Sequence, residues 1–235
     1  MRISLLGPRD RWGMSFGLTA LADLLDRRGE AARATPFHEE ALAYFERLGV
    51  RDDVPEMRFR LAHNLWRRGD HDRALAVLAQ AEREADLSGS DETRAAVAHG
   101  RTEILRAQGD WAGARACLGE SIRLLGERTV APQWRALHAS NLALLDAVDG
   151  DLVSARTHHD QALKLAVGSQ DAPIVGAVLV GFADLALRLG RPAAAGRLLG
   201  AASGVRGGPD RAILDRPRLE AAARAALGEA GFAEA

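Results

Sequence analysis

The stretch Arg68-Gly69-Asp70-His71-Asp72-Arg73-Ala74-Leu75-Ala76-Val77-Leu78-Ala79-Gln80-Ala81 contains the pattern that decides the fold. A glycine is followed by a charged residue, and alanine stands five and twelve positions after the glycine. The same pattern surrounds Gly29, Gly109, Gly150 and Gly190, so that successive glycines in the series with Gly69 are 40, 40, 41 and 40 residues apart. Self-similarity at a fixed period is typical of repeat proteins. The sequence therefore predicts five repeated units.

Small side chains occupy two fixed positions in every unit. Five residues after the glycines stand Ala34, Ala74, Ala114, Ala155 and Ala195, and twelve residues after them stand Ala41, Ala81, Ser121, Ala162 and Ala202. Where two helices approach most closely, a methyl group fits and a larger side chain does not. We expect these positions to mark helix–helix contacts.

Each unit is predicted to be a helical hairpin. Before the glycine runs an apolar stretch with helical spacing, such as Leu61, Leu65 and Trp66, and a second follows it, such as Leu75 and Leu78. A glycine in the left-handed conformation ends the first helix, and the acidic residue after it can cap the second. The linkers between units are short and polar. The sequence thus predicts one all-α solenoid with units 10–49, 50–89, 90–128, 131–169 and 171–205.

The C-terminal residues 206–235 are expected to cap the solenoid, as one part of a single structural domain. Gly204-Val205-Arg206-Gly207-Gly208-Pro209 breaks the chain, and Pro217–Leu227 is predicted to form a last helix. The exposed apolar face of a terminal repeat needs such a lid.

Composition restricts the function. The chain has 235 residues, 47% hydrophobic and 27% charged, with a formal net charge of -1. There are 46 alanines, and Lys164 is the one lysine among 31 basic residues, a skew typical of a high-GC genome. No apolar run reaches the length of a membrane span, and no signal peptide is evident. We expect a cytoplasmic protein that contacts neither membrane nor nucleic acid directly.

The repeat resembles the tetratricopeptide repeat. Leu21, Leu61 and Leu142, eight residues before their glycines, match that family's early leucine, whereas Arg101 and Phe182 depart from it. The family's aromatic after the first alanine is largely missing, and a period of 40 is longer than the family's 34 and resembles the repeats of maltose-activator-type regulators. The resemblance implies a right-handed superhelical solenoid of about five tetratricopeptide-like hairpins.

The two ends resemble the C-terminal repeat region of actinobacterial SARP-type activators and large ATP-binding LuxR-type activators. The similar segments are Asp10-Arg11-Trp12-Gly13, Arg197–Ala202 and Leu219–Phe232. Those families also carry a DNA-binding domain and an ATPase domain, yet no phosphate loop or recognition helix is found here. We interpret Ile3–Gly7 as the tail of a helix whose first part is missing, which indicates a fragment of a larger regulator. A standalone protein is the alternative.

No catalytic site, metal site or cofactor is predicted. His158 and His159 are adjacent, so they diverge by about 100° on a helix and cannot share a metal there. His159 stands at the packing position of its repeat, and Cys117 is interpreted as a small core residue. The His99–Glu103 pair is interpreted as a surface hydrogen bond, and the arginines near Arg60 as a solvated face of mixed charge.

What remains for function is the concave face. In the tetratricopeptide family the first helices line that face, and the resemblance transfers the following binding candidates: Phe16, Thr19, Asp23, Glu56, Phe59, His63, Trp66, Arg67, His99, Glu103, Arg106, Leu137, Ser140, Leu144, Asp184 and Arg188. The face is expected to be mixed and aromatic in units one to three, and apolar in units four and five. Such an apolar stripe suggests that something covers it.

Phe59 and Trp66 are seven residues apart and are predicted to anchor an amphipathic partner helix or an extended peptide. The alternative is that Trp66 packs between hairpins. By resemblance, the chain is expected to be a non-catalytic interaction or sensor domain of a transcriptional regulator, whose partner is a peptide, the regulator's own ATPase or DNA-binding part, or a small effector. A standalone scaffold and a small-molecule receptor are the alternatives.

Overall fold

The computed structural model describes residues 11–126 and 131–235. Within these ranges the chain forms eleven helices and no strand: α1 (Arg11–Arg27), α2 (Ala31–Leu48), α3 (Val54–Arg67), α4 (His71–Ser88), α5 (Asp91–Gln108), α6 (Trp111–Leu125), α7 (Pro132–Val148), α8 (Leu152–Gly168), α9 (Ala172–Arg188), α10 (Pro192–Arg206) and α11 (Arg216–Glu234). The all-helical prediction is confirmed. None of these helices is long and apolar enough to cross a bilayer. The interpretations of Ile3–Gly7 and Asp10 lie outside the described residues.

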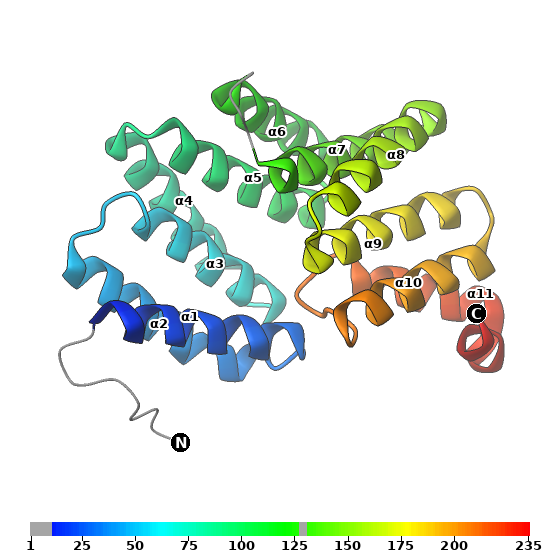
Figure 1. Cartoon of the computed structure of the whole chain (residues 1–235), viewed down its shortest axis with the longest axis horizontal. Helices are drawn as coiled ribbons and strands as arrows, with labels where there is room; N and C mark the ends of the chain where they lie inside the picture. The colour runs from blue at the N-terminus through cyan, green and yellow to red at the C-terminus, as the bar shows by residue number, and fades with distance from the viewer. Residues whose placement is uncertain (1–10, 127–130) are drawn as a thin grey trace.

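The first ten helices pack as five consecutive pairs, α1 with α2 through α9 with α10, and each pair also packs on the next one. In Figure 1 the pairs follow an arc, from α1 and α2 through α5 and α6 at the top to α9 and α10 on the right. The fold is therefore solenoid-like, as the forty-residue period predicts.

The turn glycines have the backbone conformation that the sequence predicts. Their φ values are 79°, 82°, 82°, 85° and 68° for Gly29, Gly69, Gly109, Gly150 and Gly190. A residue with a side chain would be strained at these φ values. The predicted caps are present at Asp110 and Asp151, whose carboxylates each accept a backbone N–H at 2.9 Å. They are absent at Glu30 and Asp70, which make no side-chain cap bond. The Glu30 carboxylate instead pairs with Arg28 at 3.0 Å.

The small residues at the two fixed positions lie at helix contacts. All are at most 1% exposed: Ala34, Ala41, Ala74, Ala81, Ala114, Ser121, Ala155, Ala162, Ala195 and Ala202. The one hydroxyl among them is satisfied, because Ser121 Oγ donates to the Ala95 carbonyl at 2.8 Å. The position of alanine in each repeat therefore has a packing cause.

The C-terminal segment differs from the expected cap in two ways. Helix α11 begins at Arg216 and runs past Leu227 to Glu234, with a non-helical Gly228 inside it. Leu219 and Ala223 on this helix are 0% exposed, and α11 packs on α10 and α9. The connection between α10 and α11, residues 207–215, turns toward the centre of the arc (Figure 1, orange). We call this connection the strap.

Candidate functional site

The strap bonds to the first helices of three hairpins and lines a cavity together with those of the other two. Its Arg211 N–H donates to the Arg27 carbonyl at the end of α1 at 2.9 Å. The Arg67 guanidinium of α3 donates to the Ala212 carbonyl at 3.3 Å, and Arg106 of α5 forms an ion pair with Asp215. Residues of α7 and α9 line a cavity together with the strap. We call the surface of α1, α3, α5, α7 and α9 that faces the strap the inner face.

Two aliphatic side chains of the strap pack in opposite directions. Ile213 packs against the cluster that contains Val180, Leu199 and Leu219. Leu214 packs against the α3–α5 cluster, which Trp66 also joins. The strap therefore connects the hydrophobic packing of the two arms of the arc.

The apolar stripe of units four and five is covered by the chain itself. Four of its side chains line a cavity of about 190 Å³ whose other wall is the strap: Leu137, Leu144, Ala177 and Val180. Ser140 also lines this cavity and is buried. The sequence predicts that something covers this stripe, and in the structure the strap lies opposite it.

Buried charges connect α1, α2 and α3 beside the strap. The Asp26 carboxylate accepts from His38 Nε2 at 2.7 Å and from Asn64 Nδ2 at 2.7 Å, and it pairs with Arg67 at 2.5 Å. Burial by itself raises the pKa of Asp26, but these three partners outweigh it and hold the pKa below 3.8. Arg67 is therefore held in place by a charged partner while it binds the strap.

Glu103 lies between two buried histidines of the inner face. Its carboxylate is 3.6 Å from His63 Nδ1 and 3.8 Å from His99 Nε2. Burial lowers the pKa of both histidines, although Glu103 opposes the shift. The interpretation of His99 and Glu103 as a surface pair is wrong, because His99 is 6% exposed and contacts Trp134 and His138 of α7.

Asp184 and Arg188 lie at the α9 end of the inner face. The buried Asp184 carboxylate accepts from Arg188 at 2.6 Å and from Arg218 of α11 at 2.8 Å. Burial raises its pKa, but the two arginines outweigh burial and lower the pKa below 3.8. Asp184 thus holds α11 through Arg218, and Arg188 also donates to the Ala147 carbonyl of α7 at 3.2 Å, so the Asp184 carboxylate is already engaged by two arginines.

The candidates of the first unit are separate from the strap contacts. Phe16 is 58% exposed, stacks on Trp12 at 5.8 Å and meets Phe45 edge-on at 5.9 Å. Thr19 Oγ1 contacts Met57 Sδ at 3.7 Å. Arg60 bridges Asp23 of the first unit at 3.0 Å and Glu56 of the second at 2.8 Å. The Thr19 and Arg60 contacts join α1 to α3, whereas Phe16 packs on residues of α1 and α2.

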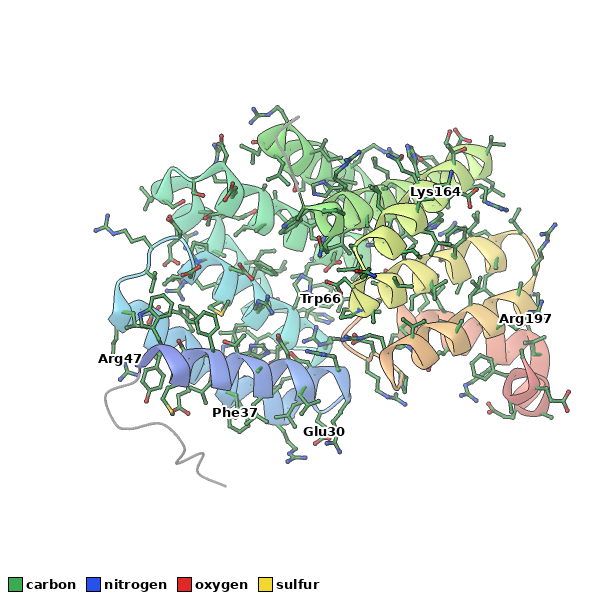
Figure 2. All side chains as sticks on the ribbon, viewed as in Figure 1. Glu30, Phe37, Arg47, Trp66, Lys164 and Arg197 are labelled. Atoms are coloured by element: carbon green, nitrogen blue, oxygen red, sulfur yellow. The ribbon has the colours of Figure 1, made fainter. Side chains whose placement is uncertain are left out.

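Phe59 and Trp66 do not form one free anchor. A Cβ on Gly100 would lie 2.8 Å from Phe59 Cδ2, so Phe59 fills the α3–α5 contact. Trp66 stacks on His71 at 4.1 Å and lines a groove of about 590 Å³ beside the strap. It lies near the middle of the arc in Figure 2. The packing alternative thus applies to Phe59, whereas Trp66 both packs and borders the groove.

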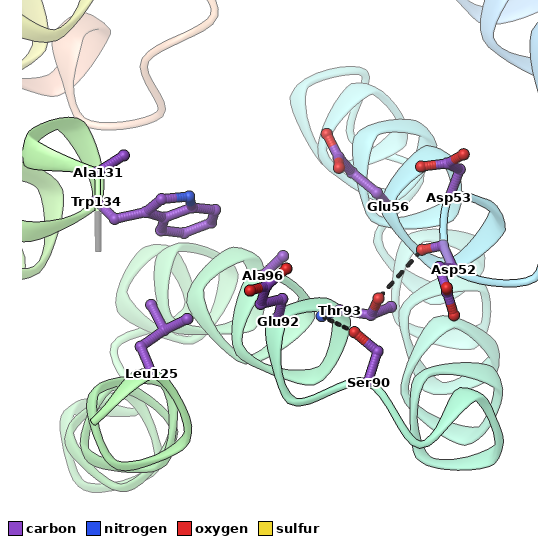
Figure 3. A pocket seen from close by; sticks show the side chains of 10 residues that line it. All are labelled: Asp52, Asp53, Glu56, Ser90, Glu92, Thr93, Ala96, Leu125, Ala131 and Trp134. Atoms are coloured by element: carbon purple, nitrogen blue, oxygen red, sulfur yellow. Dashed lines mark hydrogen bonds between the residues drawn. The ribbon is translucent and has the colours of Figure 1, made fainter. Parts of the chain in front are cut away.

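A second concavity is acidic. Asp52, Asp53, Glu56 and Glu92, together with the Trp134 ring, line about 450 Å³ between the starts of α3, α5 and α7 (Figure 3). Burial and the neighbouring Glu56 and Asp52 raise the pKa of Asp53. This concavity favours cations over anions.

The surroundings of His159 and Cys117 favour packing over a catalytic or metal-binding role. His159 is 0% exposed and stacks on Phe182 at 4.7 Å. Burial raises the pKa of Cys117, which disfavours the thiolate. Among residues 11–126 and 131–235, no group of three or more His, Cys, Asp or Glu side chains is placed to hold a metal ion.

Reasoning from the sequence missed the strap and the side chains that support its partners. Asn141, which accepts from Arg106 at 2.6 Å, and His38 were not among the candidates. One signal was present: the aliphatic pair Ile213-Leu214 stands in a link broken by Gly207, Gly208 and Pro209. Apolar residues in such a link need a surface to cover them.

Comparison with known proteins finds a solved structure with a similar fold. No family model matches the chain, and no curated protein sequence matches it. The structure is similar to the crystal structure of BtubC (BKLC) from P. vanneervenii, with a TM-score of 0.58 and 20% identity over 84% of this chain and 83% of that one. This similarity concerns the fold alone and is consistent with the all-helical, solenoid-like arrangement. The resemblance to actinobacterial regulators rests on the sequence motifs alone.

Proposed function

We propose that the chain is a non-catalytic interaction module built from tetratricopeptide-like repeats in a right-handed superhelix, and that its inner face binds an extended peptide segment. The observation that carries this proposal is the strap, a non-helical segment that bonds to α1, α3 and α5 and lines a cavity together with α7 and α9. A surface that holds one non-helical segment with hydrogen bonds, an ion pair and aliphatic contacts has the chemistry to hold another.

The sequence resemblance supports a role in a regulator. In that role, the peptide comes from a partner or from another part of the same regulator, and binding shifts the regulator between two states. A ligand shifts such an equilibrium only by its differential affinity for the two states. A scaffold that joins two other proteins would use the same inner face.

The test is a selection of linear peptides against the full chain, followed by binding measurements on two matched variants. Leu144→Arg places a charge in the cavity of the inner face, whereas Val153→Arg changes an outer residue of α8 that is 80% exposed. We expect Leu144→Arg to abolish binding and Val153→Arg to leave it unchanged, with both circular dichroism spectra preserved. Binding lost in Val153→Arg alone would place the site on the outer surface and contradict the proposal.

A small-molecule receptor is the second candidate function. The groove beside the strap has a volume of about 590 Å³, within the range of small-ligand pockets, and is lined by Asp26, Trp66 and Arg67. A thermal-shift screen of the full chain tests this candidate, because a ligand that binds only the folded state raises the melting temperature.

A further inference from the structure

We propose that the strap is an internal ligand of the inner face, and that the partner which replaces it is a peptide segment with two adjacent aliphatic residues followed by an acidic residue. The inference rests on the proposed function and names the partner's chemistry. It follows from what the strap, Gly207–Asp215, presents to the inner face and from what that face would lack without it.

The aliphatic requirement comes from two separate subsites. Ile213 and Leu214 are consecutive, yet one packs on the α9–α11 cluster and the other on the α3–α5 cluster. Both side chains are only partly buried, as in a segment that lies on a surface. Residues 211–215 form turns, and the Arg216 N–H donates to the Ile213 carbonyl at 3.1 Å, so one short turn-forming peptide can present both side chains to the two subsites.

The acidic requirement comes from Arg106. This arginine is 7% exposed, and its described partners are the Asn141 carboxamide and the Asp215 carboxylate. An arginine that is buried without a negative partner is strongly unfavourable. Any segment that displaces the strap must therefore bring its own carboxylate to Arg106. Arg67 has no such need, because Asp26 remains beside it and its contact with the strap is to a backbone carbonyl.

The strap can leave without dismantling the last hairpin. Gly207 and Gly208 have φ of 76° and 156°, so the strap begins at two permissive backbone positions. Helix α11 has anchors outside the strap, since Arg216 donates to the Leu199 carbonyl at 3.1 Å and to Ser203 Oγ at 2.6 Å. Its first turn also bonds to Ile213 and Asp215 of the strap, and these bonds lie at the strap's own end. A tethered segment competes at an effective concentration on the order of millimolar, so the partner's apparent affinity falls in proportion to the open fraction.

The experiment uses the full chain and a fluorescent peptide with the sequence of residues 209–217. Leu214→Ser combined with Asp215→Asn weakens the strap in place, and we expect this variant to bind the peptide at least about ten-fold more tightly than the unchanged chain. A peptide carrying Asp215→Asn should bind the variant about ten-fold more weakly than the parent peptide, because it leaves Arg106 unpaired. Adding Arg106→Gln to the variant should remove that difference between the two peptides.

A second measurement covers the case in which the variant does not fold. Excess peptide added to the unchanged chain should accelerate hydrogen exchange at the Arg211 amide, whose bond to the Arg27 carbonyl is lost when the strap leaves. Acceleration by the Asp215→Asn peptide should be weaker. No acceleration by either peptide overturns the proposal.

Other outcomes separate this inference from the proposed function. If peptides selected on the inner face carry no aliphatic pair and no acid, the inference is wrong and the proposed function stands. If no selected peptide is sensitive to Leu144→Arg, both are wrong. If the strap variant forms a dimer that the peptide does not dissociate, the occupant is the strap of a second copy and the partner named here is wrong.

Discussion

At the scale of single residues, the position nine residues after each turn glycine shows how surroundings decide what one side chain contributes. Leu78, Leu118 and Leu199 occupy it in three units and are buried. In the other two units the residue is histidine. His38 is bonded to Asp26 at 2.7 Å, whereas neither ring nitrogen of His159 has a hydrogen-bond partner among the residues that the structure describes. The same residue type is thus satisfied in one unit and unsatisfied in another.

We predict opposite effects of leucine at these two histidines. Burial lowers the pKa of His159 from 6.5 to about 4. Between these two pH values the imidazole is protonated in the unfolded chain and neutral in the folded chain. That histidine therefore reduces stability as pH falls through this window, by about 2 kcal/mol at pH 5. His159→Leu should be at least as stable as the unchanged chain at pH 7 and gain that difference at pH 5.

The matched control is His38→Leu. It removes a hydrogen bond from the buried Asp26 carboxylate and should lower the free energy of unfolding by about 2 kcal/mol. Urea unfolding at pH 7 and pH 5 measures both variants. Equal effects of the two substitutions would show that the repeat position, not the hydrogen-bond partner, sets the contribution.

At the scale of helices, the contact between α3 and α5 depends on one glycine. Gly100 is buried in the middle of α5, where glycine weakens a helix, and the Phe59 ring occupies the space of the missing side chain. His63, which like Phe59 belongs to α3, places its Nε2 at 2.8 Å from the Gly100 carbonyl oxygen. The units therefore interlock through a specific close approach as well as through the alanines that the repeat predicts.

We predict that Gly100→Ala destabilises the fold although alanine is the better helix former. The new Cβ would lie 2.8 Å from Phe59 Cδ2, and relieving that contact should cost about 1–3 kcal/mol. Gly119→Ala is the control in α6, where nothing lies within 4 Å of the new Cβ, and it should stabilise by about 1 kcal/mol. Thermal unfolding of both variants checks the prediction. A stabilised Gly100→Ala would mean that Phe59 is loosely packed.

At the scale of the whole molecule, buried histidines lie at successive contacts along the arc. His63 joins α3 to α5, and His99 and His138 meet between α5 and α7, with ring centroids 5.6 Å apart. His159 of α8 stacks on Phe182 of α9. Burial lowers the pKa of all four, to about 4 for His138 and His159. Protonation of these histidines at low pH therefore destabilises several helix contacts at once.

We predict that the free energy of unfolding is flat from pH 8 to 7 and falls below pH 6.5. His138 and His159 alone give a slope of about 3 kcal/mol per pH unit near pH 5, because the unfolded chain binds two more protons there. Below about pH 4 the contribution of His138 and His159 levels off, and protonation of Asp26 and Asp184, whose pKa values lie below 3.8, removes further stability. Urea unfolding across this range measures the slope, and a pH-independent midpoint between pH 7 and 5 would contradict it.

Much of the fold follows from the sequence, and less of the site does. The turn glycines, the helix pairs and the ten small contact residues follow from local spacing, because each depends on residues within one unit. The candidate face is only partly predictable: Arg67 and Arg106 do meet a non-helical segment, but Phe59 and Asp184 are occupied by packing and ion pairs. Spacing places a side chain on a helix face and does not identify what lies opposite.

By itself the sequence determined the forty-residue unit, the hairpin and where its helices touch. Only the tertiary structure decided that the strap returns to the inner face, where Arg106 meets Asp215, 109 residues away, and Arg67 meets Ala212, 145 residues away. The physical reason is that a small rotation from each unit to the next accumulates along the arc. Local periodicity fixes each hairpin but not that sum, and the strap has no periodicity from which its path could be predicted.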